Sequence, residues 1–127
     1  MIQNMMMIGA GGFMGSVMRY GISEYITRAL ATQHPVGTFV VNIVGSFILG
    51  LVLGLSQSGE VLSESRKLFF AVGFCGGFTT FSSFAFENFS MIQSQQFFLS
   101  VMYAGVSLVL GLSAVYGGLR LSGVVIN

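Results

Sequence analysis

Charge is what this 127-residue chain has least of. Charged side chains make up 7% of it and hydrophobic ones 54%. A soluble domain typically carries about 25% charged residues to cover its surface. So few charged side chains cannot keep a surface of this size in water. Most of the chain must therefore be surrounded by lipid or by other protein.

Other shortages exclude whole classes of function. The single cysteine, Cys75, cannot form an intramolecular disulfide. The single histidine, His34, excludes a His-rich metal site, and the absence of Asp argues against a cage of carboxylates around a metal. Because no histidine lies in an apolar run to act as a base, enzymatic activity is the least favoured function. The formal net charge of +1 provides no basic surface for nucleic acid.

Long apolar runs are what the chain has instead. A helix that spans a membrane needs roughly 20 mostly apolar residues. The first run lacks the charged start and the cleavage pattern of a signal peptide, so we interpret it as a retained helix. The sequence predicts an all-α membrane protein with one transmembrane domain over residues 1–127 and both termini on the same side. The four expected transmembrane helices cover approximately residues 2–30, 35–56, 68–92 and 97–121.

The positive charges give only a weak indication of orientation. Arg66, Lys67 and Arg120 lie on one side of the expected four-span arrangement. Arg28 lies on the other side, and Arg19 is inside the first span. The positive-inside rule counts Lys and Arg near the span ends. The chain could insert in one weakly favoured orientation or both ways round, and the second case would permit an antiparallel homodimer.

Polar and small residues follow one face of two predicted spans, because positions four apart share a helix face. Small residues allow helices to approach closely in lipid. The hydroxyls could form ordinary interhelical hydrogen bonds or a polar track. An unpaired amide at this depth costs several kcal/mol, so Asn42 either joins helices or serves as a donor in a pathway. The residues are Thr38, Asn42, Ser46, Gly50 and Gly54 in the second span, and Tyr103, Ser107 and Gly111 in the fourth.

The third apolar run is interrupted around residues 76–80. Three Gly and two Thr lie within eight residues there. Gly costs about 1 kcal/mol relative to Ala inside a helix, and Thr is also a poor helix former. Broken backbone at membrane depth is tolerated only inside protein or along a water-filled path. Its freed carbonyls suit a hard cation such as Na⁺, so we expect a third helix that is broken near its middle beside an ion site.

Phenylalanines follow this interruption. Phe81 and Phe84 share one face of a helix that resumes there. The edge of a phenyl ring is positive, so two such rings could hold an anion with the help of serine hydroxyls. Ordinary packing is the alternative, since the chain has 13 Phe. The neighbouring Gly/Thr segment and the pair Ser82 and Ser83 favour the anion interpretation.

Two ionisable residues are expected at membrane depth. Arg19 lies in the first span and Glu87 in the third. Such residues are candidates for a functional site by default. A structural ion pair, within a subunit or between subunits, is an equally good interpretation.

Three segments resemble the Fluc (CrcB) family of bacterial fluoride channels. They are residues 11–15 (GGFMG) leading to Arg19 and Tyr20, residues 37–45 (GTFVVNIVG) and residues 76–84 (GGFTTFSSF). The resemblance covers nearly the whole chain, and the last two segments together are highly specific. One difference is that many members of the family have Thr where this chain has Ser83, which keeps the hydroxyl and loses a methyl group.

The resemblance implies an antiparallel, dual-topology homodimer with several passes through the bilayer of the bacterial cytoplasmic (inner) membrane. Its two pathways would carry fluoride passively out of the cytoplasm and so reduce fluoride toxicity. It also implies a structural Na⁺ at the dimer centre, held by the backbone carbonyls of Gly76 and Thr79. Arg19 matches a vestibule arginine and Glu87 a pore-end glutamate. The implied fluoride pathway consists of Thr38, Asn42, Phe81, Ser82, Ser83, Phe84, Tyr103 and Ser107.

A proton-coupled small multidrug exporter is the alternative function. Those proteins also have four short spans and dual topology, but they depend on a Glu within the first span and on aromatic cages that include Trp. Here Glu24 lies toward the end of the first span, and Trp is absent. A purely structural subunit is a third possibility, but it would leave the interrupted third span as an unexplained cost.

Overall fold

All regular secondary structure in the described residues is helical, as the sequence predicts. The structure is a computed structural model that describes residues 1–59 and 62–124. No strand occurs in these two ranges. The helices are α1 (Ile2–Leu30), α2 (Val36–Gln57), α3 (Glu64–Lys67), the π-helical η1 (Leu68–Phe74), α4 (Cys75–Phe78), α5 (Phe81–Gln93) and α6 (Phe97–Leu121).

Three helical segments of the described chain are long and apolar enough to cross a membrane. They are Val36–Gln57, Glu64–Gln93 and Phe97–Leu121, with mean hydropathies of 2.3, 1.5 and 2.0. α1 has 29 residues but is not among them, and it carries the charged residues Arg19, Glu24 and Arg28. The segments therefore indicate a multi-pass membrane protein.

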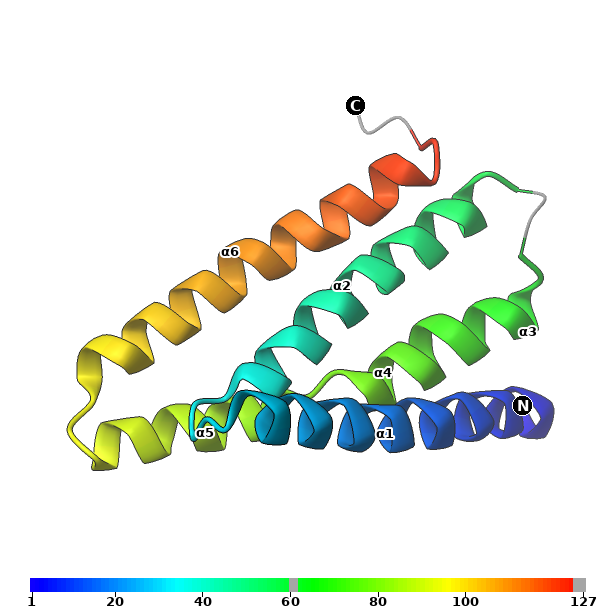
Figure 1. Ribbon diagram of the computed structural model, residues 1–127. Coiled ribbons are helices and arrows are strands. Elements are labelled where there is room, and N and C mark those ends of the chain that lie inside the picture. Colours follow the sequence, from blue (N-terminus) through cyan, green and yellow to red (C-terminus); the bar gives the residue numbers. More distant parts are fainter. Residues whose placement is uncertain (60–61, 125–127) are drawn as a thin grey trace.

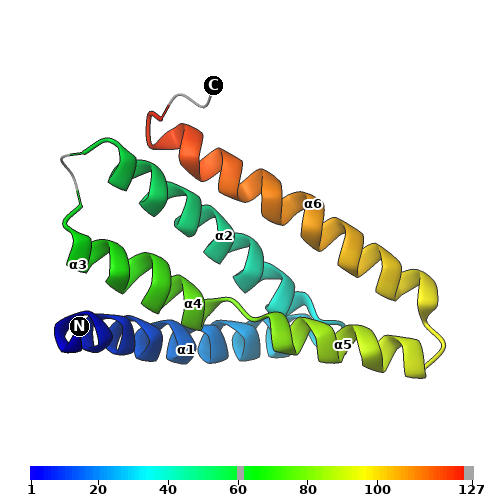
Figure 2. The same cartoon turned by 180° about the vertical axis from the view of Figure 1, so that it is seen from behind.

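The long helices run in alternating directions. Figure 1 shows α2 and α6 side by side, while α1 lies along the segments α3 to α4, and Figure 2 shows the same arrangement from behind. In both views the start of α1 and the end of α6 lie toward the same side. α1 packs mainly against η1 and α4, and α2 packs mainly against α6.

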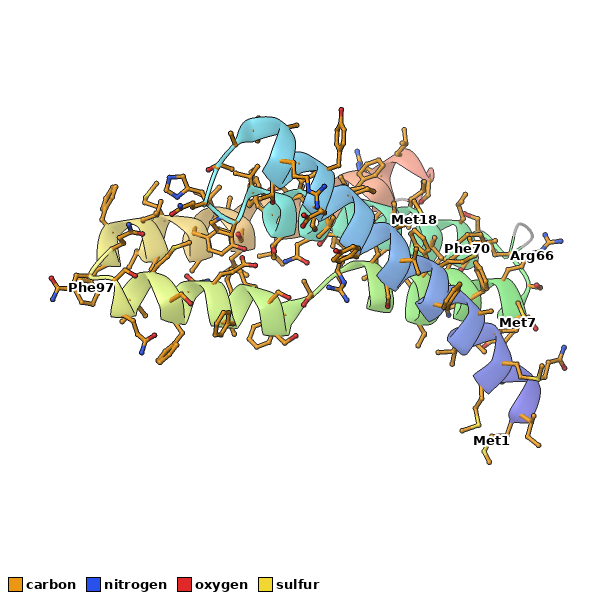
Figure 3. The ribbon with its side chains drawn as sticks, turned by 60° about the horizontal axis from the view of Figure 1, so that its bottom comes forward. Met1, Met7, Met18, Arg66, Phe70 and Phe97 are labelled. Atoms are coloured by element: carbon orange, nitrogen blue, oxygen red, sulfur yellow. The ribbon has the colours of Figure 1, made fainter. Side chains whose placement is uncertain are left out.

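Many large apolar side chains on the outside of the helices are exposed, because no other part of the described chain packs against them. Figure 3 shows Met18 of α1 and Phe70 of η1 at the surface, with Phe97 and Met1 at opposite ends of the molecule. A soluble monomer rarely exposes a large continuous apolar patch. Lipid or a second protein chain must therefore cover these surfaces.

Glycines allow the close contact between α1 and the third-span segments. Gly11 and Gly15 are buried one turn apart on α1. A Cβ on Gly11 would collide with the carbonyl oxygen of Phe69, and a Cβ on Gly15 with that of Phe74. The backbones can approach this closely only because no side chain stands between them.

The contact between α2 and α6 has the same basis. A Cβ on Gly50 would collide with the carbonyl oxygen of Val115, and a Cβ on Gly118 with that of Phe47. The predicted close packing along the small residues of the second span is confirmed, and its partner is α6.

Gly118→Ala is expected to destabilise the protein, whereas Gly117→Ala is not. The first change forces α2 and α6 apart, and overpacking of this kind typically costs about 1–3 kcal/mol. The Cβ of Ala at position 117 meets nothing closer than 3.9 Å, so that change gains helix propensity without a clash. Thermal unfolding in detergent, followed by circular dichroism, measures the difference. Equal midpoints for the two variants would contradict the proposed close contact.

The third apolar segment does not form one continuous helix. α4 ends at Phe78 and α5 begins at Phe81. Between them Thr79 has φ −89° and ψ 159°, and Thr80 has φ −149° and ψ 117°, so both are extended. The preceding turns of η1 are π-helical, a form that is rare and is often found beside functional sites.

Candidate functional site

Asn42 of α2 binds the backbone at the point where the helix stops. Its Oδ1 accepts a hydrogen bond of 2.8 Å from the amide of Thr80, and its Nδ2 donates to the Thr80 carbonyl at 3.2 Å. In a continuing α-helix the Thr80 amide would donate to the carbonyl of Gly76. Asn42 therefore joins α2 to the break, and one of its two amide N–H donors remains for another partner.

Thr80 also caps the helix that follows. Its Oγ1 accepts from the amide of Ser83 at 3.2 Å and lies 3.1 Å from the Ser83 hydroxyl and 3.3 Å from that of Ser82. A threonine at this N-cap position satisfies an amide that has no partner within the helix. The two serines predicted for the site are thus at the first turn of α5, held by Thr80.

The carbonyls at the end of α4 have partners of two kinds. Cys75 O accepts from the Thr79 amide at 3.0 Å and from the Thr79 hydroxyl at 2.8 Å. Gly77 O accepts from Nε of Arg19, 2.9 Å away on α1. Hydrogen bonds from α1, from α2 and from the segment itself therefore hold the break open.

Glu87 gathers hydroxyl groups from two other helices. Thr38 of α2 donates to its Oε1 at 2.5 Å, and Tyr103 of α6 donates to its Oε2 at 2.8 Å. The sequence pattern placed Thr38 and Tyr103 on one track but left Glu87 apart from them. The structure joins all three into a polar cluster, hereafter the Glu87 cluster.

Arg19 and Glu87 do not pair with each other. Among residues 1–59 and 62–124, the salt bridge found joins Arg28 to Glu24 at 2.7 Å on the exposed side of α1. Arg19 binds a carbonyl and Glu87 binds hydroxyls. The interpretation of these two charges as an ion pair within one subunit is therefore wrong.

The ring of Phe84 connects the break to the Glu87 cluster. It lies 6.0 Å from the ring of Phe81 at an interplanar angle of 38°, and 5.1 Å from the ring of Tyr103 at 48°. Phe84 is half-buried, whereas 80% of Phe81 is exposed. The two phenyl rings predicted to share a face are neighbours, and one of them has no cover within this chain.

An open groove of about 600 Å³ runs along the break. Its lining includes Asn42, Phe81 and Phe84 together with Gly76. Ser107 of α6 also lines it, and its hydroxyl is buried without a hydrogen-bond partner in the described chain. A buried hydroxyl of this kind is costly unless it has a partner, so it has a donor to offer to something that enters the groove.

Thr38 and Glu87 border a second cavity, of about 440 Å³. Its other walls are mostly polar and include Ser23, Ser90 and His34. The predicted site residues therefore fall in two adjoining places, the groove along the break and the Glu87 cluster, with Arg19 at the α1 side of the break.

Thr80 is the site residue that sequence reasoning missed. The sequence pointed to Thr79 by its likeness to a family motif, whereas it is Thr80 that binds Asn42 and caps α5. The spacing of Thr80 before Ser83 at the start of an apolar run is an N-cap pattern, and that signal could have identified it.

Comparison with known proteins settles the family. Residues 6–119 match the family model described as CrcB-like protein, Camphor Resistance (CrcB). The chain belongs to the CrcB family. The resemblance inferred from the three sequence segments is thereby confirmed.

Several CrcB relatives are similar along almost their whole length. One from Azobacteroides pseudotrichonymphae is 42% identical over 118 residues, which is 93% of this chain and 94% of the relative. One from a strain of Thermus thermophilus is 39% identical over 126 residues, 99% and 98% of the two chains. One from a strain of Chlorobium phaeobacteroides is 42% identical over 113 residues, 89% and 87%. Each of the three is named "Fluoride-specific ion channel FluC", and ion channels are not enzymes.

Proposed function

We propose that this chain forms a fluoride-selective channel that carries fluoride passively out of the bacterial cytoplasm. The observation that supports it is the groove along the break. Its lining includes two neighbouring phenyl rings, a serine hydroxyl that is buried without a hydrogen-bond partner among the described residues, and an amide with a donor to spare. The relatives that are named as fluoride channels favour fluoride over other anions as the ion that passes.

Fluoride is small and strongly hydrated, so a narrow path must replace the water molecules that it loses. Hydroxyl and amide groups supply hydrogen-bond donors, and ring edges supply positive electrostatic potential. Asn42, Ser107 and the pair Phe81 and Phe84 offer these groups on one groove. Thr38 and Tyr103 continue the polar track toward Glu87, but each donates its single hydroxyl proton to the carboxylate there, so the free donors are those of Asn42 and Ser107.

The assembly we propose is an antiparallel homodimer in the cytoplasmic membrane, with α1 as a fourth span. The exposed ring of Phe81 and the open side of the groove support a second copy as the cover. The weak charge asymmetry of the chain permits insertion in both orientations. The 29 residues of α1 are long enough to cross a bilayer.

A structural Na⁺ at the dimer centre is the cofactor we propose. The donor set fits, because Thr80 N binds Asn42 and leaves the carbonyl of Gly76 without its helical partner. Gly76 is exposed, and nothing lies within 4 Å of where its Cβ would stand. The carbonyls of Gly76 and Thr79 would hold the ion, which supplies a fixed positive charge that compensates the carbonyl dipoles of the break.

The multidrug exporter has no support from these observations. Its required first-span Glu corresponds here to Glu24, which is paired with Arg28 at 2.7 Å and is 42% exposed. The relatives named above are channels.

Fluoride efflux from liposomes that contain the purified protein tests the proposal. We expect fluoride to leave down its gradient without any pH gradient, and chloride to stay inside. An exporter would need the pH gradient and would ignore fluoride. A protein that passes neither halide, or both equally, would remove the proposed function.

A further inference from the structure

The end of α4 receives a hydrogen bond from a side chain of α1. Arg19 donates from Nε to Gly77 O at 2.9 Å, and its side chain is half-buried. In a continuing α-helix this carbonyl would accept from the amide of residue 81, but the helix stops before that residue. Arg19 therefore satisfies a carbonyl that the break leaves without a helical partner.

The register of α1 explains why Arg19 reaches this carbonyl. Gly11, Gly15 and Arg19 are each four residues apart, so they share one face of α1. The two glycines bring the backbone of α1 against the backbones of η1 and α4. A Cβ on Gly15 would lie 2.8 Å from the amide nitrogen of Phe78. One turn later, the same face presents Arg19 to the final turn of α4.

The electrostatics of this contact are favourable. The carboxyl end of a helix carries partial negative charge, which a guanidinium stabilises. Within the described residues, the salt bridge on this helix uses Arg28 and Glu24 and leaves Arg19 to the carbonyl. An unpaired carbonyl at membrane depth is costly. Without the Arg19 donor, α4 would therefore tend to end at a different residue, where its last carbonyls have partners.

We propose that Arg19 is a positioning residue that fixes where α4 ends, and not a free charge that attracts anions. By holding Gly77 O, it sets the neighbouring carbonyls of Gly76 and Thr79 and the start of α5 with Phe81. The inference rests on the proposed function for its flux measurement, while its measurement of stability does not depend on fluoride.

Three substitutions separate the hydrogen bond from the charge. The Nε2 atom of Gln stands the same number of bonds from the backbone as Nε of Arg, so Arg19→Gln keeps a donor there and loses the charge. Arg19→Lys keeps the charge but places a methylene at that position. Arg19→Met has neither the charge nor the donor. Arg28→Gln is the matched control, because Arg28 is an exposed residue of the same helix whose partner is Glu24.

Fluoride efflux and thermal unfolding midpoints are measured for all variants, with sodium varied against potassium in the unfolding experiments. We expect Arg19→Gln to keep wild-type flux within about threefold, and Arg19→Met and Arg19→Lys to lose about tenfold or more, as expected when the Gly77 carbonyl loses its donor. Sodium should raise the thermal unfolding midpoint of the wild-type protein relative to potassium. Arg19→Met should need a higher sodium concentration than wild type for the same rise, whereas Arg19→Gln should need the same concentration as wild type.

The opposite ranking overturns the inference. Wild-type flux in Arg19→Lys with a loss in Arg19→Gln would mean that the charge acts at a distance. Wild-type flux and stability in Arg19→Met would mean that Arg19 positions nothing. If the wild-type protein itself passes no fluoride, the proposed function fails. The unfolding midpoints of the variants then still test the role of Arg19 in the break.

Discussion

Phe84→Ile is expected to reduce fluoride efflux by up to about tenfold, which is the loss expected when aromatic contacts worth up to about 1.5 kcal/mol disappear. The ring of Phe84 lies between those of Phe81 and Tyr103, at 6.0 and 5.1 Å. Ile keeps an apolar side chain of similar bulk but has no ring edge to place against an anion. Phe81→Ile should have the same kind of effect, because both rings line the groove along the break.

The control for these variants lies on the same helix. Phe89 of α5 is 54% exposed and lines neither that groove nor the cavity beside Glu87, so Phe89→Ile should leave efflux near the wild-type rate. All three proteins should elute as the wild-type protein does in size-exclusion chromatography. Wild-type efflux in both Phe81→Ile and Phe84→Ile would show that the ring edges have no role in conduction.

Asn42→Ala is expected to abolish efflux and to lower stability together. The change leaves the amide and the carbonyl of Thr80 without the partners that Asn42 supplies. Each buried backbone group left unpaired costs about 1–3 kcal/mol. The chain can recover part of this cost if the Thr80 amide returns to Gly76 O, which would extend α4 into the break and change the groove.

Ser56→Ala is the matched control for Asn42→Ala. Ser56 is also on α2, but its hydroxyl binds the carbonyl of Val52 within the same helix. Its loss leaves no group of another helix unpaired. Efflux and the thermal unfolding midpoint in detergent should both stay close to wild type. An Asn42→Ala protein with normal efflux and a normal midpoint would refute the role of Asn42 at the break.

Phe84→Ile and Asn42→Ala test two different properties of the groove along the break. The Phe84 variant tests the path of the anion, since it leaves every hydrogen bond at the break in place. The Asn42 variant tests the break itself, since it leaves the rings in place. If Phe84→Ile lowers fluoride efflux and Asn42→Ala does not, the anion passes the rings and conduction does not depend on the Asn42 contact.

Much of the fold could be predicted because lipid imposes simple rules on a sequence. Runs of apolar residues must be helical when no water can satisfy the backbone. The cluster of Gly and Thr before Phe81 pointed to the segment where α4 ends, because those residues stabilise a helix poorly. α1 is the exception, since its length matches the expectation but it is not among the segments that are apolar enough to cross a membrane.

The partners of the polar groups could not be predicted, because a hydrogen bond between helices depends on their relative rotation and height. The sequence left Asn42 equally suited to joining helices and to serving as a donor, and only the packing of α2 places it on Thr80. In the same way Glu87 had no predicted partner until three helices brought Thr38 and Tyr103 to it.

By itself, the sequence determined the membrane class and the all-helical architecture, which depend on composition and local propensity, and the family, which its motifs resemble. Only the tertiary structure decided that Arg19 binds Gly77 O, that Asn42 binds the backbone of Thr80 and that the rings of Phe84 and Tyr103 are neighbours. Those contacts depend on how the helices are placed against one another. Glycines contribute to this placement, because they let α1 and α2 approach neighbouring helices to backbone contact.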